Sequence, residues 1–160
     1  MGNGSKTFGL IAGVALAVWG AVASAAECLE NQVHLRGDFG EARFSVELAK
    51  TRAERNRGLM FRDSMPQSAG MLFIYKEPGT RNFWMKNTFI PLDIIFLDET
   101  GTVQRIKSEA EPRNVSRIFG GDNIQFVLEI NGGLAEAMGI DEGDELQHPA
   151  LDQEKAAWPC

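Results

Sequence analysis

The stretch N-F-W-M-K-N-T-F-I-P-L-D, residues 82–93, brings aromatic, cationic, amide and carboxylate side chains together in a short span of the chain. If this stretch is extended, successive side chains point to opposite faces, so Trp84 and Lys86 share one face. Pro91 has no N–H to donate and suits the first residue of a following strand. The stretch therefore predicts a β-hairpin in which Lys86 lies opposite Asp93.

The Trp84 face of this hairpin has two interpretations. A surface pair of Lys86 and Asp93 would contribute less than about 1 kcal/mol, and an exposed indole often only covers a secondary core. The same indole, with a cation, a carboxylate and the amide of Asn87 beside it, also suits a ligand site. The hairpin alone leaves both interpretations open.

The first residues of the chain have the pattern of a secretory signal peptide. Lys6 supplies a positive charge, residues 8–22 form an uncharged apolar run, and Ala23-Ser24-Ala25 matches an A-x-A cleavage site. The run is shorter than the ~20 residues of a membrane-spanning helix, which leaves an uncleaved anchor as the alternative. We predict a signal peptide at residues 1–25, cleaved after Ala25 or Ala26, and an exported protein, periplasmic or secreted, with no stable membrane span.

Residues 26–160 have the size of one domain, about 135 residues. The chain has 16 Lys and Arg against 22 Asp and Glu, and this acidic balance argues against a nucleic-acid partner. Basic residues nevertheless crowd one short segment, Lys50, Arg52, Arg55, Arg57 and Arg62. Such a patch can hold an anion or an acidic partner, although it is more often a solvated helix face.

Two cysteines, Cys28 and Cys160, lie near the two ends of the predicted domain. In an oxidising compartment such a pair is more suited to a disulfide than to a metal site. Chain entropy gives this long loop a stabilisation of about 4 to 5 kcal/mol at most. Neither cysteine has a histidine or an amide beside it in sequence, so neither is a candidate nucleophile.

Alternation and turn signals predict about seven or eight short strands and two short helices. Thr51 and Glu54 form a capping box that begins the first helix, and Gly58 is placed to end it in the left-handed conformation. Glu129 interrupts an apolar run and lies either on an exposed face or inward, where it must be paired. The predicted strands are residues 33–36, 42–48, 71–75, 83–88, 92–97, 103–106 and 126–130. The second helix is 134–138, ended by Gly139, and turns or loops are 37–40, 76–80, 98–101 and 109–122.

These elements predict a mainly β fold. We expect a compact single-domain sandwich or barrel with two short helices. A C-terminal tail with little pattern begins at about residue 149.

Several motifs together resemble the family known only as domain of unknown function 192. They are R-G-L-M-F-R at 57–62, G-M-L-F at 70–73, F-W-M-K-N-T at 83–88, P-L-D at 91–93, L-E-I-N-G-G at 128–133 and G-I-D-E-G-D at 139–144. The resemblance spans residues 44–146 and implies a compact, mostly β domain, often exported in bacteria and also found in archaea, with no established activity. The motifs also contain polar groups that core packing would not require, which favours a ligand or partner site at the central stretch.

A binding module is the function that these residue types favour. Trp84 offers a flat apolar face, Lys86 and Asn87 offer oriented polar groups, and Arg57 or Arg62 could meet an anion. We expect a non-enzymatic module for a small polar or anionic ligand or a cell-envelope partner, without a cofactor. Its candidate site residues are Arg57, Arg62, Trp84, Lys86, Asn87, Asp93 and Glu129.

Two other functions remain as alternatives. A hydrolase or lyase could use Lys86 with Asp93 or Glu129, but the chain has no nucleophile elbow, paired histidine ligands, phosphate-binding loop or dinucleotide fingerprint. Thioethers suit Cu(I), but methionine more often fills gaps in a core, and both histidines lie far from the methionines in sequence, so we expect no metal. The residues of this copper hypothesis are Met60, Met65, Met71, Met85, Met138, His34 and His148.

Overall fold

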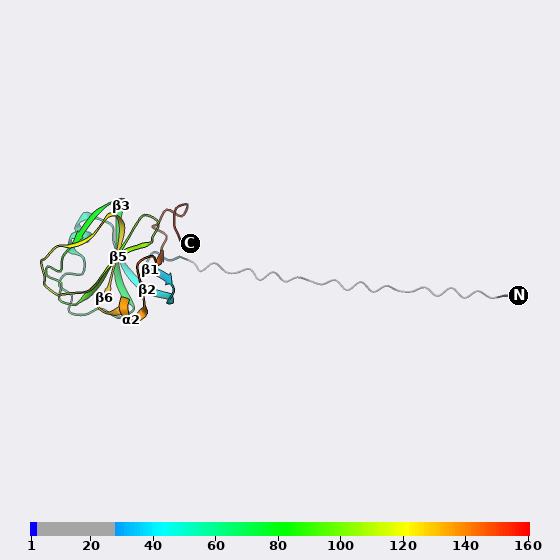
Figure 1. Cartoon of the computed structure of the whole chain (residues 1–160), viewed down its shortest axis with the longest axis horizontal. Helices are drawn as coiled ribbons and strands as arrows, with labels where there is room; N and C mark the ends of the chain where they lie inside the picture. Colours follow the sequence, from blue (N-terminus) through cyan, green and yellow to red (C-terminus); the bar gives the residue numbers. More distant parts are fainter. Residues whose placement is uncertain (3–27) are drawn as a thin grey trace.

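The computed structural model describes residues 1–2 and 28–160, and the predicted signal peptide falls almost wholly outside them. The described chain forms one curled seven-stranded sheet with two short helices, which confirms the predicted mainly β single domain (Figure 1). The strands are β1 (Gln32–Gly37), β2 (Gly40–Ala49), β3 (Ala69–Phe83), β4 (Leu92–Leu97), β5 (Val103–Ala110), β6 (Ile118–Asn131) and β7 (Glu145–Gln147), and the helices are α1 (Arg52–Arg57) and α2 (Leu134–Met138). No helix of this part is long and apolar enough to cross a membrane.

The sheet has the strand order β5-β4-β6-β3-β2-β1-β7. Only β2 and β3 pair in parallel among these strands, and α1 lies in the connection between them. A β-bridge joins Thr102, just before β5, to Glu145 in β7, so the sheet curls into a half-barrel.

Two apolar clusters cover the two faces of the sheet. The first draws buried residues from every strand, so it fills the inside of the curl. The second lies over the other face of the central strands and is roofed by loop residues such as Leu59 and Met85. In β6 the alternation is direct, because Leu128 belongs to the inner cluster and Val127 to the outer one.

Several local predictions are confirmed. The β1–β2 hairpin turns at Gly37 and Gly40, and the capping box is formed, with the Thr51 hydroxyl accepting from the Glu54 N–H at 3.2 Å. Gly139 ends α2 in the left-handed conformation. Gly58 also has a positive φ, 48°, but its ψ of −138° lies outside the left-handed helical region.

The predicted hairpin of residues 82–93 is wrong. Strand β3 ends at Phe83, and β4 pairs with β5 and β6 instead of with residues 84–88. Every residue of β4 is buried, and strands occupy both of its hydrogen-bonding edges, so no edge remains for a hairpin partner. Asp93 consequently lies opposite Ile130 of β6, and not opposite Lys86.

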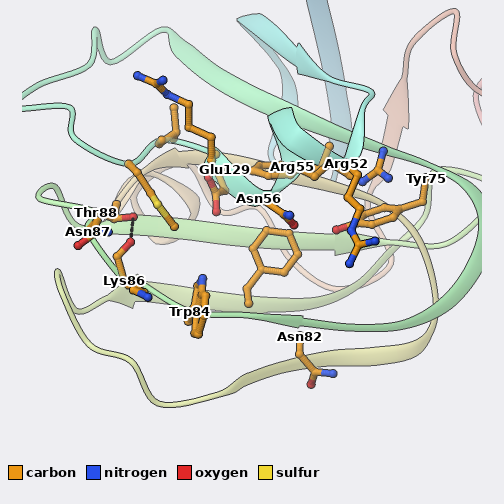
Figure 2. A pocket seen from close by; sticks show the side chains of 16 residues that line it. Arg52, Arg55, Asn56, Tyr75, Asn82, Trp84, Lys86, Asn87, Thr88 and Glu129 are labelled. Atoms are coloured by element: carbon orange, nitrogen blue, oxygen red, sulfur yellow. Dashed lines mark hydrogen bonds between the residues drawn. The ribbon is translucent and has the colours of Figure 1, made fainter.

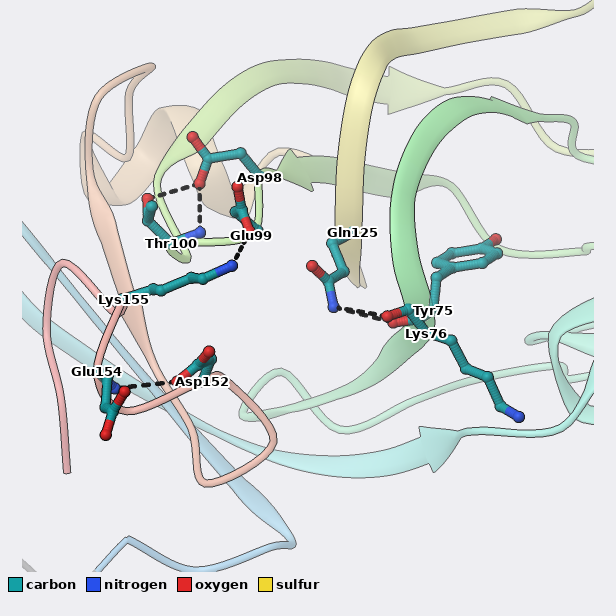
Figure 3. Close-up of polar contacts among 9 residues, drawn as sticks. All are labelled: Tyr75, Lys76, Asp98, Glu99, Thr100, Gln125, Asp152, Glu154 and Lys155. Atoms are coloured by element: carbon teal, nitrogen blue, oxygen red, sulfur yellow. Dashed lines mark hydrogen bonds and ion pairs between the residues drawn. The ribbon is translucent and has the colours of Figure 1, made fainter.

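Two other predicted connections are also different in the structure. Residues 76–80, predicted as a turn, form an irregular part of β3 with a register shift against β6 between Ile74 and Gly79. The side-chain amide of Gln125 donates to the carbonyls of Tyr75 and Lys76 there, at 3.2 and 3.3 Å (Figure 3). The predicted loop 109–122 is shorter, because β5 and β6 extend into it from both sides.

The C-terminal tail packs against the barrel. Leu151 joins the inner cluster, and the guanidinium of Arg36 lies 4.6 Å from the ring centroid of Trp158. Lys155 pairs with Glu99 at 2.9 Å (Figure 3). Cys160 forms the predicted disulfide with Cys28, so the tail is bonded to the segment before β1.

Candidate functional site

A cleft of about 700 Å³ opens where α1 and the residues after it cover β3 and β6 (Figure 2). Short α1 is positioned by its capping box, and Arg52, Arg55 and Asn56 share one face of it at helical spacing. The lining residues are Arg52, Arg55, Asn56, Arg57, Gly58, Leu59, Met60, Phe73, Tyr75, Asn82, Phe83, Trp84, Lys86, Asn87, Thr88 and Glu129.

Three basic side chains of the cleft have neither an acidic partner nor a hydrogen-bond acceptor among the described residues. These are Arg52, Arg57 and Lys86, which we call the rim cations. Arg55 is held differently, because it donates to the Ile74 carbonyl at 3.0 Å and stacks 4.7 Å from the Tyr75 ring centroid. The rim cations are therefore available to an anion.

Trp84 and Lys86 meet in the cleft, although the strand predicted to join them is absent. The Lys86 Nζ lies 5.3 Å from the Trp84 ring centroid, within cation–π distance, and the indole is 51% exposed. Asn87 lies beside them with a φ of 56°, a conformation that few residues other than glycine adopt. Its carbonyl accepts from the Phe61 N–H at 2.8 Å, which fixes this loop against the segment that follows α1.

Glu129 belongs to β6 and reaches the cleft from the sheet. It is only 5% exposed, and its partners across the two neighbouring strands are Met71 and Ile94, both members of the outer cluster. Within residues 28–160 no side chain or backbone group hydrogen-bonds to its carboxyl group. Burial raises the pKa of Glu129 to about 8, so this carboxyl is mostly protonated at neutral pH. The interpretation that Glu129 lies on an exposed face is therefore wrong. Glu129 points inward, but the partner expected for an inward carboxyl group is missing among the described residues.

Two of the predicted site residues lie outside the cleft. Asp93 is fully buried, and its carboxylate accepts three backbone N–H groups, from Glu109 at 2.7 Å, Gly133 at 3.0 Å and Ala135 at 2.7 Å. These bonds tie β4 to β5 and to the start of α2, which is a structural role. Arg62 pairs with Glu47 of β2, with Nη2 2.6 Å from Oε2, and that hydrogen bond raises the pKa of Arg62.

The structure adds residues that were not among the seven candidate site residues. Tyr75 and Asn82 enter the cleft because β3 continues through the predicted turn. Arg52 and Arg55 enter from α1, and the crowding of basic residues in that segment was the signal for them. Asn56, between them, carried no signal of its own.

The residues of the copper hypothesis are scattered over different environments. Met71 and Met85 are buried in the outer cluster, and Met138 is exposed on α2. His148 is buried, with its Nε2 2.8 Å from the Glu30 carbonyl and its Nδ1 accepting from the Ala150 N–H at 3.0 Å. Burial lowers the pKa of His148, so the ring is held neutral by its surroundings.

Comparison with known proteins identifies one family and two similar solved structures. The family profile of DUF192, described as an uncharacterized ACR, matches residues 33–148, and no curated protein matches. The crystal structure of a protein of unknown function from Novosphingobium aromaticivorans DSM 12444 is 42% identical, with a TM-score of 0.71, over 72% of this chain and 82% of that chain. A crystal structure from Sinorhizobium meliloti 1021, of a protein described as a candidate transcription regulator, is 34% identical, with a TM-score of 0.74, over 79% of this chain and 99% of that chain.

Proposed function

This chain belongs to the uncharacterised family DUF192, and we propose that it is an exported domain that binds a small polar or anionic ligand in the cleft beneath α1. The observation that carries this proposal is the composition of the cleft. It combines the three rim cations with an exposed indole and with one buried carboxyl group that has no partner among the described residues.

The charge of the cleft contrasts with that of the whole chain. The formal net charge is −6, and yet the cleft contains Arg52, Arg55, Arg57 and Lys86 against the single acid Glu129. Cations grouped in a concavity focus the local potential and attract anions. An anion in this cleft would supply the partners that the rim cations lack.

The remaining lining groups are of the kind that orient a ligand. The rings of Tyr75, Phe83 and Trp84 provide apolar faces, and the amides of Asn56 and Asn87 provide both donors and acceptors. A few polar groups set among aromatic side chains are typical of sites for small molecules.

Export is supported by two independent features. The sequence has the charge, apolar run and A-x-A pattern of a signal peptide before residue 26. The disulfide between Cys28 and Cys160 is the kind of bond that persists in an oxidising compartment. A periplasmic or secreted location would give the cleft access to solutes and fragments of the cell envelope.

Isothermal titration with phosphate, citrate and glucuronate tests this proposal. We expect at least one of these anions to bind and the double variant Arg52→Ala/Arg57→Ala to weaken that binding by about tenfold or more, because two charge-assisted contacts are lost. The control is Arg43→Ala, which removes an exposed cation of β2 that is not part of the cleft lining. Equal binding by the double variant and the control would refute the proposal.

A catalytic use of the same cleft is the second candidate. Glu129 and Lys86 line one cavity, and burial raises the pKa of Glu129 to about 8, which suits a proton donor near neutral pH. A hydrolase or lyase of this type would use Glu129 as the acid, since the carboxylate of Asp93 is occupied by backbone N–H groups. Turnover of nitrophenyl esters and glycosides by the wild type, lost in Glu129→Gln, would support catalysis. Equal rates in the two proteins would exclude Glu129 from it.

A further inference from the structure

We propose that the ligand of this cleft is a zwitterion, an amino acid or short peptide, whose amine binds Glu129 and whose acidic group binds the rim cations. This inference rests on the proposed function and narrows it to one chemical class. It depends on two features of the same cavity, a buried acid without a partner and a set of cations without partners.

No described residue pairs with the carboxyl group of Glu129. The neighbouring residues on β3 and β4 are Met71 and Ile94, and Leu59 and Gly58 lie over the cleft from the segment after α1. The Glu129 side chain is only 5% exposed, and its carboxyl group lines the cavity (Figure 2). A donor that enters the cavity can therefore supply the hydrogen bond that no described residue provides.

The charged groups that face Glu129 do not act as its partners. Arg52, Arg55 and Arg57 approach from the side of α1, Lys86 from the loop after β3, and Tyr75 is the titratable group on β3. Among the described residues no ion pair joins any of these cations to the Glu129 carboxyl group, and burial is the cause that raises its pKa. The rim cations and the acid are therefore separate subsites of one cleft.

An amine matches the acid subsite better than a neutral group does. An ammonium group brings both a positive charge and three N–H donors to a carboxylate that has no other donor. An ammonium ion alone would be repelled by the rim cations, so the ligand must also carry an acidic group that meets them. Both conditions are satisfied by a zwitterion. The aromatic rings that line the cleft would then contact its apolar part.

This arrangement links binding to a proton. Glu129 is mostly protonated in the free protein at neutral pH and must ionise to pair with an ammonium group. Binding of a zwitterion should therefore release a proton below about pH 8, and its affinity should rise as the pH is raised towards that value. An anion without an amine leaves Glu129 protonated and releases none.

The experiment is calorimetric titration at about pH 6.5 with leucine, phenylalanine and alanyl-alanine, each compared with its N-acetylated form, in buffers of different ionisation enthalpy. We expect the free amines to bind about tenfold tighter or more than their acetylated forms, with release of up to one proton. Glu129→Gln should abolish both the preference and the proton release. The control Glu136→Gln, on the exposed face of α2, should preserve both.

The outcomes separate this inference from the proposed function. The zwitterion proposal is overturned by any of three results: equal binding of the free and acetylated forms, binding without proton release, or no binding of any free amine. If citrate or phosphate still binds in a manner that Arg52→Ala/Arg57→Ala weakens, anion binding stands without it. The comparison of free with acetylated ligand uses the wild-type protein, so it decides the matter even if Glu129→Gln fails to fold.

Discussion

Gly58 is in contact range of Glu129 at the cleft, because a Cβ built at Gly58 would lie 3.9 Å from the Glu129 Oε2. The same Cβ would lie 3.2 Å from the Cζ of Phe73, closer than ordinary van der Waals contact. Glycine at this position therefore both permits the positive φ that ends α1 and leaves space beside the buried acid.

Replacing Gly58 by alanine should destabilise the fold. We expect Gly58→Ala to lower the free energy of unfolding by about 1 to 3 kcal/mol, because the side chain meets Phe73 in a backbone conformation that L-residues avoid. The control is Gly143→Ala, where φ is also positive, 98°, but no atom lies within 4 Å of the added Cβ. Urea unfolding of both variants separates the two causes. A loss no larger for Gly58→Ala than for Gly143→Ala would show that the contact with Phe73 is unimportant.

Glu129 should make the protein less stable as the pH rises. Its pKa is about 8 in the folded chain against 4.5 as the ordinary value, so the unfolded chain ionises first and is favoured between these two limits. The free energy of unfolding begins to fall at about pH 4.5 and stops falling above about pH 8. The part of this fall between pH 6.5 and 8 is about 2 kcal/mol. We expect Glu129→Gln to remove this loss, as measured by urea unfolding.

His148 acts in the opposite direction to Glu129 over this pH range. Burial lowers the pKa of His148 in the folded chain, so stability is lost as the pH falls through its ordinary value of about 6.5. The ring is neutral in both states only above about pH 7.5, and between about pH 6.5 and 7.5 its small effect raises stability with pH, so it cannot produce the expected fall. A wild-type stability that is flat from about pH 6.5 to 8, or equal slopes for the wild type and Glu129→Gln, would contradict the buried protonated acid.

Asp93 and Lys86 should behave differently when truncated, although the sequence pairs them. Asp93→Ala leaves three backbone N–H groups without their acceptor, one of them buried and two partly buried, and we expect a loss of about 3 kcal/mol or more, similar to that of the core truncation Met85→Ala. Lys86→Ala removes an exposed side chain and should change stability by less than about 0.5 kcal/mol. Thermal melts of the three variants test this order. If Asp93→Ala lowered the stability only slightly, Asp93 would again be a candidate site residue.

The disulfide should be worth several kcal/mol to the isolated domain. Cys28 and Cys160 are separated by 132 positions, and closing so long a loop restricts the unfolded chain by about 4 to 5 kcal/mol in the entropy model. Calorimetry with and without reductant should therefore show a large fall in melting temperature. The variant Cys160→Ser should melt at the same temperature as the reduced wild type. An unchanged melting temperature on reduction would show that the tail packs without the bond.

Local sequence patterns predicted the local structure of this protein well. The capping box at Thr51 and Glu54, the β1–β2 hairpin and the glycine that ends α2 each depend on residues close in sequence, and all are present. The resemblance based on motifs also identified the family correctly, and it spans nearly the same residues as the match to the family profile.

The partners of each strand were beyond what local pattern could predict. The spacing of Trp84 and Lys86 predicted a strand that would pair with β4 in a hairpin. In the structure β4 is fully buried and pairs with β6, which lies far along the chain. Glu129 was ambiguous for the same reason, since its face depends on which side of β6 the loop after α1 covers. Asp93 appeared in sequence as half of an ion pair, while its true acceptor role involves N–H groups at Glu109 and in α2.

The β-bridge between Thr102 and Glu145 also helps to explain how the protein avoids aggregation through the edges of its sheet. The outermost strand on one side, β7, is only three residues long. The N–H of Val103 donates to the carbonyl of Asp144 just before this strand, and the carbonyl of Gly101 accepts from the N–H of Leu146 within it. The strand at the other side, β5, carries the exposed charges of Arg105 and Lys107 along its length. Unpaired sheet edges are the usual templates for aggregation, and short, bridged or charged edges suppress it. If the chain is exported, as we propose, its folding outside the cytoplasm would benefit from leaving so little open edge for a second chain to pair with.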